Sequence, residues 1–302
     1  MKIVFMGTPE FAVPSLEKLA NHFEVAAVVT VPDREKGRGR KVSYSPVKEK
    51  AIELGIPVLQ ANSLKDEEFI NELKSINPDI ICVIAFRILP EAVYSIAKIA
   101  SFNIHGSLLP KYRGAAPINR AIMAGDKKSG LTSFILKKQV DTGDILLKKE
   151  VEISDNMTAG ELHDLLMPLA ADLSLETINL LISGDYDALT QDESLVSPAP
   201  KIFRDECKIN SNVNYIIAKN HILGLSPYPA AFMFLEESEV KILKAEISEE
   251  NIECGEFKIS NKFLLGFEEG TLEVTELKVQ GKQATKVKDF LNGWRGVKEG
   301  KF

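Results

Sequence analysis

An asparagine and a histidine two residues apart, Asn103 and His105, close an apolar run in this chain of 302 residues. In an extended strand, residues two apart point to the same face. The amide can donate a hydrogen bond to developing negative charge, and the imidazole titrates near neutrality. Gly106 and Pro110 follow and place both groups at the carboxyl end of the strand, where open α/β sheets bind ligands. The spacing predicts a pair that stabilises an oxyanion and moves a proton; a structural, hydrogen-bonded histidine is the alternative.

A second acidic element is the turn from Asp141 to Asp144, with the sequence Asp-Thr-Gly-Asp. It lacks the further oxygen ligands of a calcium loop, and no His or Cys cluster lies near it in the sequence. One interpretation is a simple turn. The other is a carboxylate that reaches His105, orients the ring and supports its imidazolium form. The sequence leaves both open.

The first half of the chain alternates strand-like and helix-like segments, which predicts a mostly parallel sheet with helices on its faces. A polar loop is expected after residue 30, up to about residue 46. A capping box at Thr158 and Glu161 opens a long helix that ends near Gly184, and its leucines are expected in the core. We expect strands at 2–7, 25–30, 57–59, 79–85, 100–105 and 131–136. We expect one helix that ends near residue 20 and further helices over 46–54, 66–76 and 117–124.

The length favours two domains. Ser197-Pro198-Ala199-Pro200 is typical of a linker, and after it come short strand-like runs at 257–259, 263–267 and 272–277, preceded by a helix near 213–221. We therefore predict an α/β domain over 1–190, a linker over 191–204 and a smaller β-rich domain, of barrel type, over 205–302.

The composition indicates the cellular compartment and bears on nucleic-acid binding. Three widely spaced cysteines without a Cys-x-x-Cys pair argue for a reducing compartment and against a disulfide framework or a zinc ribbon. The first residues are not expected to form a signal sequence, and no stretch is expected to approach the ~18 apolar residues of a membrane span. The cytoplasm is the simplest location. The net charge of −6 does not indicate nucleic-acid binding, so any such binding needs a local basic patch.

Two further segments bear on ligands. Gly7-Thr8-Pro9 follows the first strand with one glycine where a dinucleotide fold needs several, which argues against NAD or FAD. Residues 34–41 hold five basic side chains against one acid, with Gly37 and Gly39 between them. This segment is either a solvated loop or an arm that orders on a phosphate backbone. A second basic stripe comprises Lys278, Lys282, Lys286 and Lys288.

The segment from Phe102 to Gly114, Phe-Asn-Ile-His-Gly-Ser-Leu-Leu-Pro-Lys-Tyr-Arg-Gly, resembles the folate-dependent formyltransferases. The continuation Ala115-Ala116-Pro117-Ile118, the basic segment 32–41 and Ser45-Pro46-Val47-Lys48 resemble the branch of that family that acts on methionyl-tRNA. The likeness covers essentially the whole chain. Two departures stand out: Ala85 to Pro90 is one residue shorter than the usual Ala-Tyr-Gly-x-x-Leu-Pro, and 137–140 reads Lys-Lys-Gln-Val where Asp-x-Gly-Leu is common.

The resemblance implies a Rossmann-like catalytic domain that uses 10-formyltetrahydrofolate as co-substrate without a metal. It also implies a carboxyl-terminal OB-like barrel that helps to hold initiator methionyl-tRNA. The family's catalytic trio matches Asn103, His105 and Asp141. The family's inserted loop contacts the acceptor stem, and the matching positions here are Arg38, Arg40 and Lys41. The implied folate pocket comprises Phe86, Ile88, Leu89, Ser107, Leu108, Leu109 and Pro110.

The implied activity is formyl transfer to the α-amino group of methionyl initiator tRNA, for translation initiation, by a monomer that needs no membrane. Formyl transfer to a sugar nucleotide or to glycinamide ribonucleotide is the alternative within enzymes, and a hydrolase that releases formate is a further variant. A non-catalytic RNA-binding protein is the alternative of another class. The basic loop and the β-rich tail favour the tRNA substrate.

Overall fold

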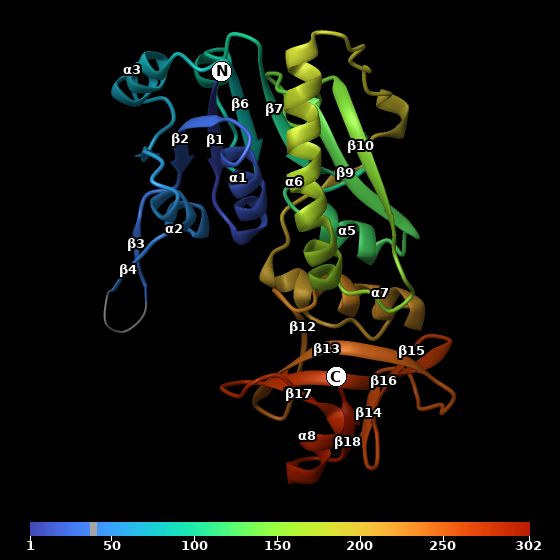
Figure 1. Cartoon of the computed structure of the whole chain (residues 1–302). Helices are drawn as coiled ribbons and strands as arrows, with labels where there is room; N and C mark the ends of the chain where they lie inside the picture. Colours follow the sequence, from blue (N-terminus) through green and yellow to red (C-terminus); the bar gives the residue numbers. More distant parts are fainter. Residues whose placement is uncertain (37–40) are drawn as a thin grey trace. The chain divides into compact units, whose positions relative to one another are not determined.

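The computed structural model describes residues 1–36 and 41–302 (Figure 1). The chain divides into two compact units, and each is described by itself. The first comprises 1–114, 130–151 and 163–198; the second comprises 115–129, 152–162 and 199–302.

The first unit is built on one sheet in which the strands follow the order β10-β9-β7-β6-β1-β2-β5. The strands β1, β2, β5, β6 and β7 run parallel, and β9 is antiparallel to β7. Their bounds are Lys2–Gly7 (β1), Glu24–Thr30 (β2), Val58–Gln60 (β5), Ile80–Ile84 (β6), Ala100–His105 (β7), Lys128–Ile135 (β9) and Ile145–Glu152 (β10).

Parallel strands are covered on both faces, so their sequences are continuous apolar runs rather than alternating ones. Every residue of β6 is buried, and β1 is buried from Ile3 onward. One buried cluster on this sheet includes Val4, Met6, Ile81 and Val83. The predicted parallel sheet is confirmed.

Two helices of this unit begin at a side-chain N-cap. Ser45 accepts a hydrogen bond from the Lys48 amide at the start of α2, and Asp66 accepts one from the Glu68 amide at the start of α3. The helical bounds are Glu10–Ala12 (η1), Val13–Ala20 (α1), Pro46–Glu53 (α2), Glu67–Ile76 (α3), Glu91–Tyr94 (α4), Ala159–Ser183 (α6) and Glu193–Leu195 (η2).

The strand order creates a switch point at the carboxyl end of β1. After β1 the chain builds outward through β2 and β5, then returns to the other side of β1 with β6 and β7. Ligands of open α/β sheets bind at such a point. Gly7 at the end of β1 lies opposite Ile84 of β6, and Ile84 lies opposite Ile104 of β7. His105 therefore ends its strand beside the switch point.

Helix α6 is long and apolar enough to cross a membrane by length and composition, which corrects the expectation that no stretch approaches a membrane span. A single helix of this kind is weak evidence for a membrane, because core helices of soluble proteins pass the same test. Leu162, Leu166 and Leu173 on α6 are buried, and Asp172 forms an ion pair with Lys18 of α1. Leu165, predicted in the core, is 42% exposed.

The second unit holds an antiparallel sheet with the order β12-β13-β16-β15-β14-β18, and β17 pairs with β16. It confirms a small β-rich part after residue 200. The strands are Ala231–Leu235 (β12), Ser238–Ser248 (β13), Glu256–Ile259 (β14), Phe263–Phe267 (β15), Gly270–Val279 (β16), Thr285–Lys286 (β17) and Glu299–Lys301 (β18). The helices are Pro117–Met123 (α5), Arg204–Cys207 (η3), Tyr215–Leu225 (α7) and Val287–Gly293 (α8).

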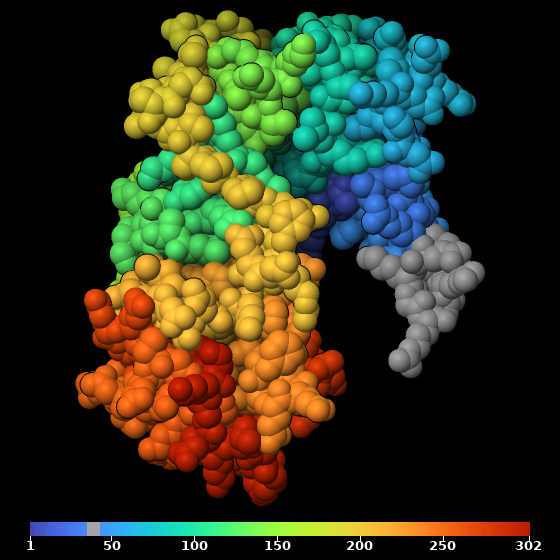
Figure 2. Space-filling model, turned by 180° about the vertical axis from the view of Figure 1, so that it is seen from behind, coloured from blue at the N-terminus to red at the C-terminus, as the bar shows by residue number. Residues whose placement is uncertain are grey.

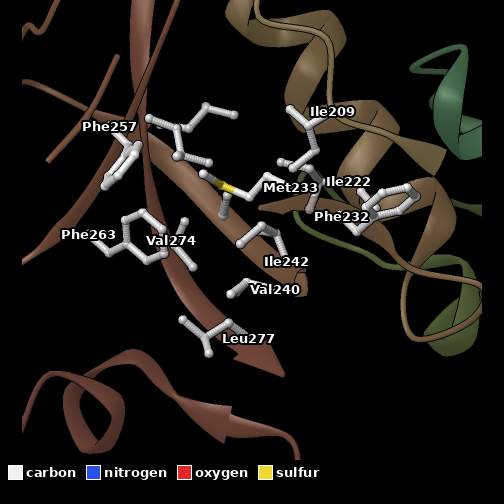
Figure 3. Close-up of a cluster of buried hydrophobic side chains, with 14 of the residues drawn as sticks. Ile209, Ile222, Phe232, Met233, Val240, Ile242, Phe257, Phe263, Val274 and Leu277 are labelled. Atoms are coloured by element: carbon white, nitrogen blue, oxygen red, sulfur yellow. The ribbon is translucent and has the colours of Figure 1, made fainter. Parts of the chain in front are cut away.

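Strand β13 bends this sheet. Its pairing with β16 is irregular between Ile242 and Ala245, and such bulges increase local twist. Side chains from β12, β13, β14, β15 and β16 and from α7 meet in one buried cluster (Figure 3). Phe263 lies in this cluster and stacks on Phe290 of α8 at 6.1 Å between ring centroids.

Several elements escaped the sequence analysis. The polar loop expected before residue 46 contains two short antiparallel strands, Arg34–Lys36 (β3) and Lys41–Ser43 (β4). Strand β10 was not predicted because four of its eight residues are charged. Strands β12 and β13, and the short helix α4, were also missed. The remaining short strands are Arg113–Gly114 (β8) and Pro198–Ala199 (β11).

His221 on α7 makes the stability of the second unit depend on pH. Burial lowers the pKa of its imidazole, although its hydrogen bond to the Glu206 carbonyl, at 2.8 Å, acts in the opposite direction. The unfolded chain then binds more protons below about pH 6.5, the ordinary histidine value. Stability is therefore fully present above that pH and is lost as pH falls toward the lowered pKa. We expect His221→Gln to weaken this dependence in chemical denaturation, and His22→Gln, on the surface, to leave it in place. An equal dependence in His221→Gln would contradict the assignment.

Candidate active site

Asn103 and His105 lie at the end of β7 on one face of the sheet, as the period of two predicts. In register, Asn103 faces Val83 of β6, and His105 faces Thr132 of β9. The Asn103 Oδ1 atom is buried and has no hydrogen-bond partner among the described residues. A buried polar atom without a partner costs about 1–3 kcal/mol, so such positions call for an explanation. A ligand that completes the hydrogen bonding of the amide explains this one.

The orientation of His105 is set by a main-chain group. Its Nε2 atom lies 2.7 Å from the carbonyl oxygen of Tyr112, and the side chain is nearly fully buried. A carbonyl can only accept, so Nε2 carries a hydrogen and donates it. The other ring nitrogen, Nδ1, is then the atom that gains or loses a proton. It faces the Oδ2 atom of Asp141 at 3.7 Å.

Asp141 comes to this position through the turn that follows β9. It is buried, and its backbone is left-handed with φ of 56°. The Gly114 amide donates a hydrogen bond to Oδ2 at 2.9 Å, which holds the carboxylate beside the imidazole. Asp144, the other acid of the turn, pairs with Lys137 at 2.8 Å. Of the two interpretations of this turn, the geometry matches the carboxylate that reaches His105.

The loop after His105 is fixed by Thr132, which is fully buried. The Thr132 hydroxyl donates to the Ser107 carbonyl at 2.7 Å and accepts from the Leu109 amide at 3.0 Å. The Ser107 hydroxyl in turn donates to the Lys111 carbonyl at 2.6 Å. This hydroxyl is therefore engaged within its own loop rather than directed at the imidazole. Cys82 of β6 is no nucleophile either, because burial raises the pKa of its thiol far above neutrality.

The residues expected around a folate do not share one environment. Ile88 is 73% exposed, whereas Phe86 and Leu89 are partly buried against the apolar cluster of the first unit. Leu109 is fully buried and packs with Phe134 and Ile145. Their assignment to a folate pocket stays a prediction. The other three predicted positions are Ser107 and Pro110, which are buried, and Leu108, which is half-buried.

Arg87 shows how the shortened segment after β6 is held. Its guanidinium donates to the carbonyl oxygens of Ala61 at 2.8 Å and Asn62 at 3.1 Å, and it lies over the Phe86 ring. Burial lowers the pKa of this group. The preceding Ala85 takes a left-handed φ of 48°. The segment is thus fixed by an arginine that holds neighbouring carbonyls, without the glycine expected from the resemblance.

The basic residues predicted to bind RNA are only partly described. Arg38 and Arg40 lie outside the described residues, and Lys41 begins β4 with its backbone paired to Lys36. In the second stripe, Lys278, Lys282, Lys286 and Lys288 are all exposed. Lys286 is paired with Glu276 at 2.6 Å, and this hydrogen bond raises the pKa of Lys286. The stripe is therefore partly neutralised within the protein.

Metal binding finds no support in the part of the chain that the structure describes, where no group of three or more His, Cys, Asp or Glu could hold an ion. The carboxyl ends of the parallel strands offer a different kind of site. The Thr8 hydroxyl, directly after β1, is a second buried polar atom without a partner in residues 1–36 and 41–302. Figure 2 shows that the surface of the first unit is hollowed where dark blue and teal atoms meet.

Two residues that the sequence analysis did not single out complete the geometry. Arg113 and Gln191 are joined by hydrogen bonds of 2.8 and 3.0 Å, and Gln191 also contacts the Asp141 turn. Gln191 stands at the start of the segment predicted as a linker, so nothing in its sequence context indicated a role in the site.

Two family models match this chain: formyl transferase over residues 1–177, and formyl transferase, C-terminal domain, over residues 201–295. The methionyl-tRNA formyltransferase of Clostridium novyi is 46% identical over 299 residues, covering 97% of each chain. The enzyme of the same name from Parabacteroides distasonis is 40% identical and covers 99% of this chain and 97% of its own. The chain belongs to the methionyl-tRNA formyltransferase family.

A solved structure has the same fold as this chain. The N-formyltransferase from Helicobacter canadensis, in complex with folinic acid and dTDP-3-aminofucose, has a TM-score of 0.69 to this chain. The two are 23% identical, and the match covers 94% of this chain and all of the other. At this identity the likeness extends to the fold alone.

Proposed function

We propose that this protein transfers a formyl group from 10-formyltetrahydrofolate to the α-amino group of methionyl initiator tRNA, as a step in translation initiation. The observation that carries the proposal is that Asn103 and His105 share one face at the carboxyl end of β7, with Asp141 Oδ2 3.7 Å from His105 Nδ1. Full-length relatives named for this reaction support the choice of substrate.

The reaction begins with an amine that must lose protons. A free α-amino group has a pKa of about 8, so part of it is neutral near pH 7 and can attack the formyl carbon. Attack forms a carbon–nitrogen bond and places negative charge on the formyl oxygen. The Asn103 amide donates a hydrogen bond to that oxygen, which is the role of an oxyanion-hole donor. The donor to the oxyanion is Nδ2; the unpartnered Oδ1 atom is the accepting end of the same amide and is open to an N–H of the substrate.

His105 handles the proton. Because Nε2 is engaged by the Tyr112 carbonyl, Nδ1 is the nitrogen that takes a proton from the attacking amine. The Asp141 carboxylate at 3.7 Å attracts the resulting positive charge. When the bond from the formyl carbon to N10 of the folate breaks, the proton passes to N10. The transfer is direct, because Ser107 and Cys82 do not supply a nucleophile beside the ring.

The folate, as co-substrate, fits the carboxyl ends of β1, β6 and β7. Residues 86–89 and 107–110 border these strand ends, and the unpartnered hydroxyl of Thr8 lies at one of them. We assign Phe86, Ile88, Leu89 and Ser107 to Pro110 to its pocket on this basis. The buried members shape the pocket floor, and the exposed Ile88 is free to cover a ring.

The second unit supports a role in holding tRNA. We propose that its bent antiparallel sheet is an OB-like barrel, and that Lys278, Lys282 and Lys288 contribute to a phosphate-binding surface. We also propose the functional division 1–190, 191–204 and 205–302, because the two family matches flank residues 178–200. Because the proposed substrate takes part in translation, we propose that the reaction occurs in the cytoplasm. We also propose a monomer, because the proposed catalytic trio lies within one chain.

The proposal is tested by offering labelled 10-formyltetrahydrofolate with four separate acceptors: methionyl initiator tRNA, glycinamide ribonucleotide, an amino-sugar nucleotide and water. We expect label on methionyl-tRNA alone. Asn103→Ala should lower turnover by about 10²–10³-fold and His105→Ala by about 10²–10⁴-fold, with folding intact. His163→Ala, at a histidine outside the site, is the control. Label on another acceptor would overturn the substrate, and near-normal turnover in either variant would remove that residue from the mechanism.

The basic loop has its own test. We propose that Arg38, Arg40 and Lys41 bind the tRNA backbone, on the family resemblance of residues 32–41. Arg38→Ala should weaken use of tRNA and reduce the salt slope of binding by about one, because one phosphate contact is lost. Arg38→Lys, which keeps the charge, should retain most of the slope. An equal loss of folate affinity would contradict the assignment.

A further inference from the structure

We propose that Gln191 is a positioning residue for the reaction: its amide holds the backbone turn that carries Asp141, and thereby sets the carboxylate against His105. This inference rests on the proposed function, because it assumes that Asp141 acts in catalysis. Gln191 is 5% exposed, lies outside β7 and outside the Asp141 turn, and has no direct contact with the imidazole in the described hydrogen-bond network.

The amide nitrogen of Gln191 uses both of its hydrogens on the turn. It donates to the Asp141 carbonyl at 2.9 Å and to the Gly143 carbonyl at 2.8 Å. Asp141, which makes the first of these contacts, has a left-handed backbone, a conformation that persists only where the surroundings hold it. Gly143 is packed so closely on β9 that an added Cβ would lie 1.6 Å from the Ile135 carbonyl oxygen. The turn is thus held by the Gln191 amide on one side and by its close packing against β9 on the other.

The amide oxygen of Gln191 is held by a cation. The Arg113 guanidinium donates to it through Nε at 3.0 Å and through Nη2 at 2.8 Å, and the same guanidinium also contacts Glu193. A glutamine amide has one accepting end and one donating end. Here the cation faces the oxygen and two carbonyls face the nitrogen, so the four hydrogen bonds allow a single orientation of the amide.

Arg113 links Gln191 to a segment that contacts both His105 and Asp141. Its neighbour Tyr112 accepts the hydrogen bond from His105, and its other neighbour Gly114 donates to Asp141 Oδ2. One short segment therefore touches both the imidazole and the carboxylate, and Gln191 ties that segment to the backbone of Asp141. Loss of the tie frees the carboxylate to shift relative to Nδ1. A misplacement of about 1 Å by a distant change can cost about 10²-fold in rate.

The test compares Gln191→Glu and Gln191→Met with Asp192→Asn. The glutamate keeps an acceptor for Arg113 but cannot donate to the two carbonyls, and the uncharged methionine guards against a fold lost to a buried charge. Asp192 neighbours Gln191, but its carboxylate accepts hydrogen bonds from the Ser194 amide and hydroxyl and not from the Arg113 guanidinium or the Asp141 turn in the described residues. We expect both Gln191 variants to lower kcat by about 10–100-fold, with KM for folate and for methionyl-tRNA changed by less than about threefold. Asp192→Asn should stay within about twofold.

A double-mutant cycle separates positioning from a general structural effect. In an Asp141→Asn background, a residue that acts through the Asp141 carboxylate should cost almost nothing more, whereas a structural residue should lower kcat again. A full further loss would overturn the proposal, and so would normal kcat in both Gln191 variants alongside an impaired Asp141→Asn. Near-normal turnover of Asp141→Asn itself would instead refute the proposed role of Asp141.

Discussion

The hydrogen bond from His105 Nε2 to the Tyr112 carbonyl is the contact on which the site depends. A carbonyl can only accept, so this bond decides which ring nitrogen keeps its hydrogen and which is free to exchange a proton. It also fixes the ring so that Nδ1 faces Asp141. In the proposed mechanism the Asn103 amide, on the same strand face, donates a hydrogen bond to the developing negative charge. Proton transfer and oxyanion stabilisation are thus assigned to two residues whose positions follow from one strand.

The sheet places this strand where chemistry can occur. His105 ends β7 between a parallel neighbour, β6, and an antiparallel neighbour, β9. The antiparallel partner brings Thr132 to the loop after His105, and the turn after β9 returns Asp141 to the imidazole. The antiparallel strand β9 therefore carries Thr132, which holds the loop, and leads to Asp141, the carboxylate of the proposed trio. The Gln191 contacts extend the same arrangement to a segment after α6.

Sequence alone predicted the parts that follow from local rules. The period of two predicted that Asn103 and His105 share one face of a strand, and the Gly and Pro that follow predicted where the strand ends. The Tyr112 carbonyl could not be predicted, because a main-chain acceptor is common to all residue types. Gln191 stands in a polar stretch typical of linkers, and only the folded chain brings it to Asp141. Strand β10 was missed because its exposed face carries charges, and Leu165 because helical spacing does not tell how wide a buried face is.

The most direct test of this account is the protonation of the two ring nitrogens of His105 in solution. Histidine labelled with ¹⁵N in the full-length protein gives signals for four residues, and His105→Ala identifies the one that matters. We predict that the neutral ring carries its hydrogen on Nε2, with Nδ1 bare, and that acidification adds the proton to Nδ1. A neutral ring with its hydrogen on Nδ1 would contradict the role of the Tyr112 carbonyl and the path of the proton.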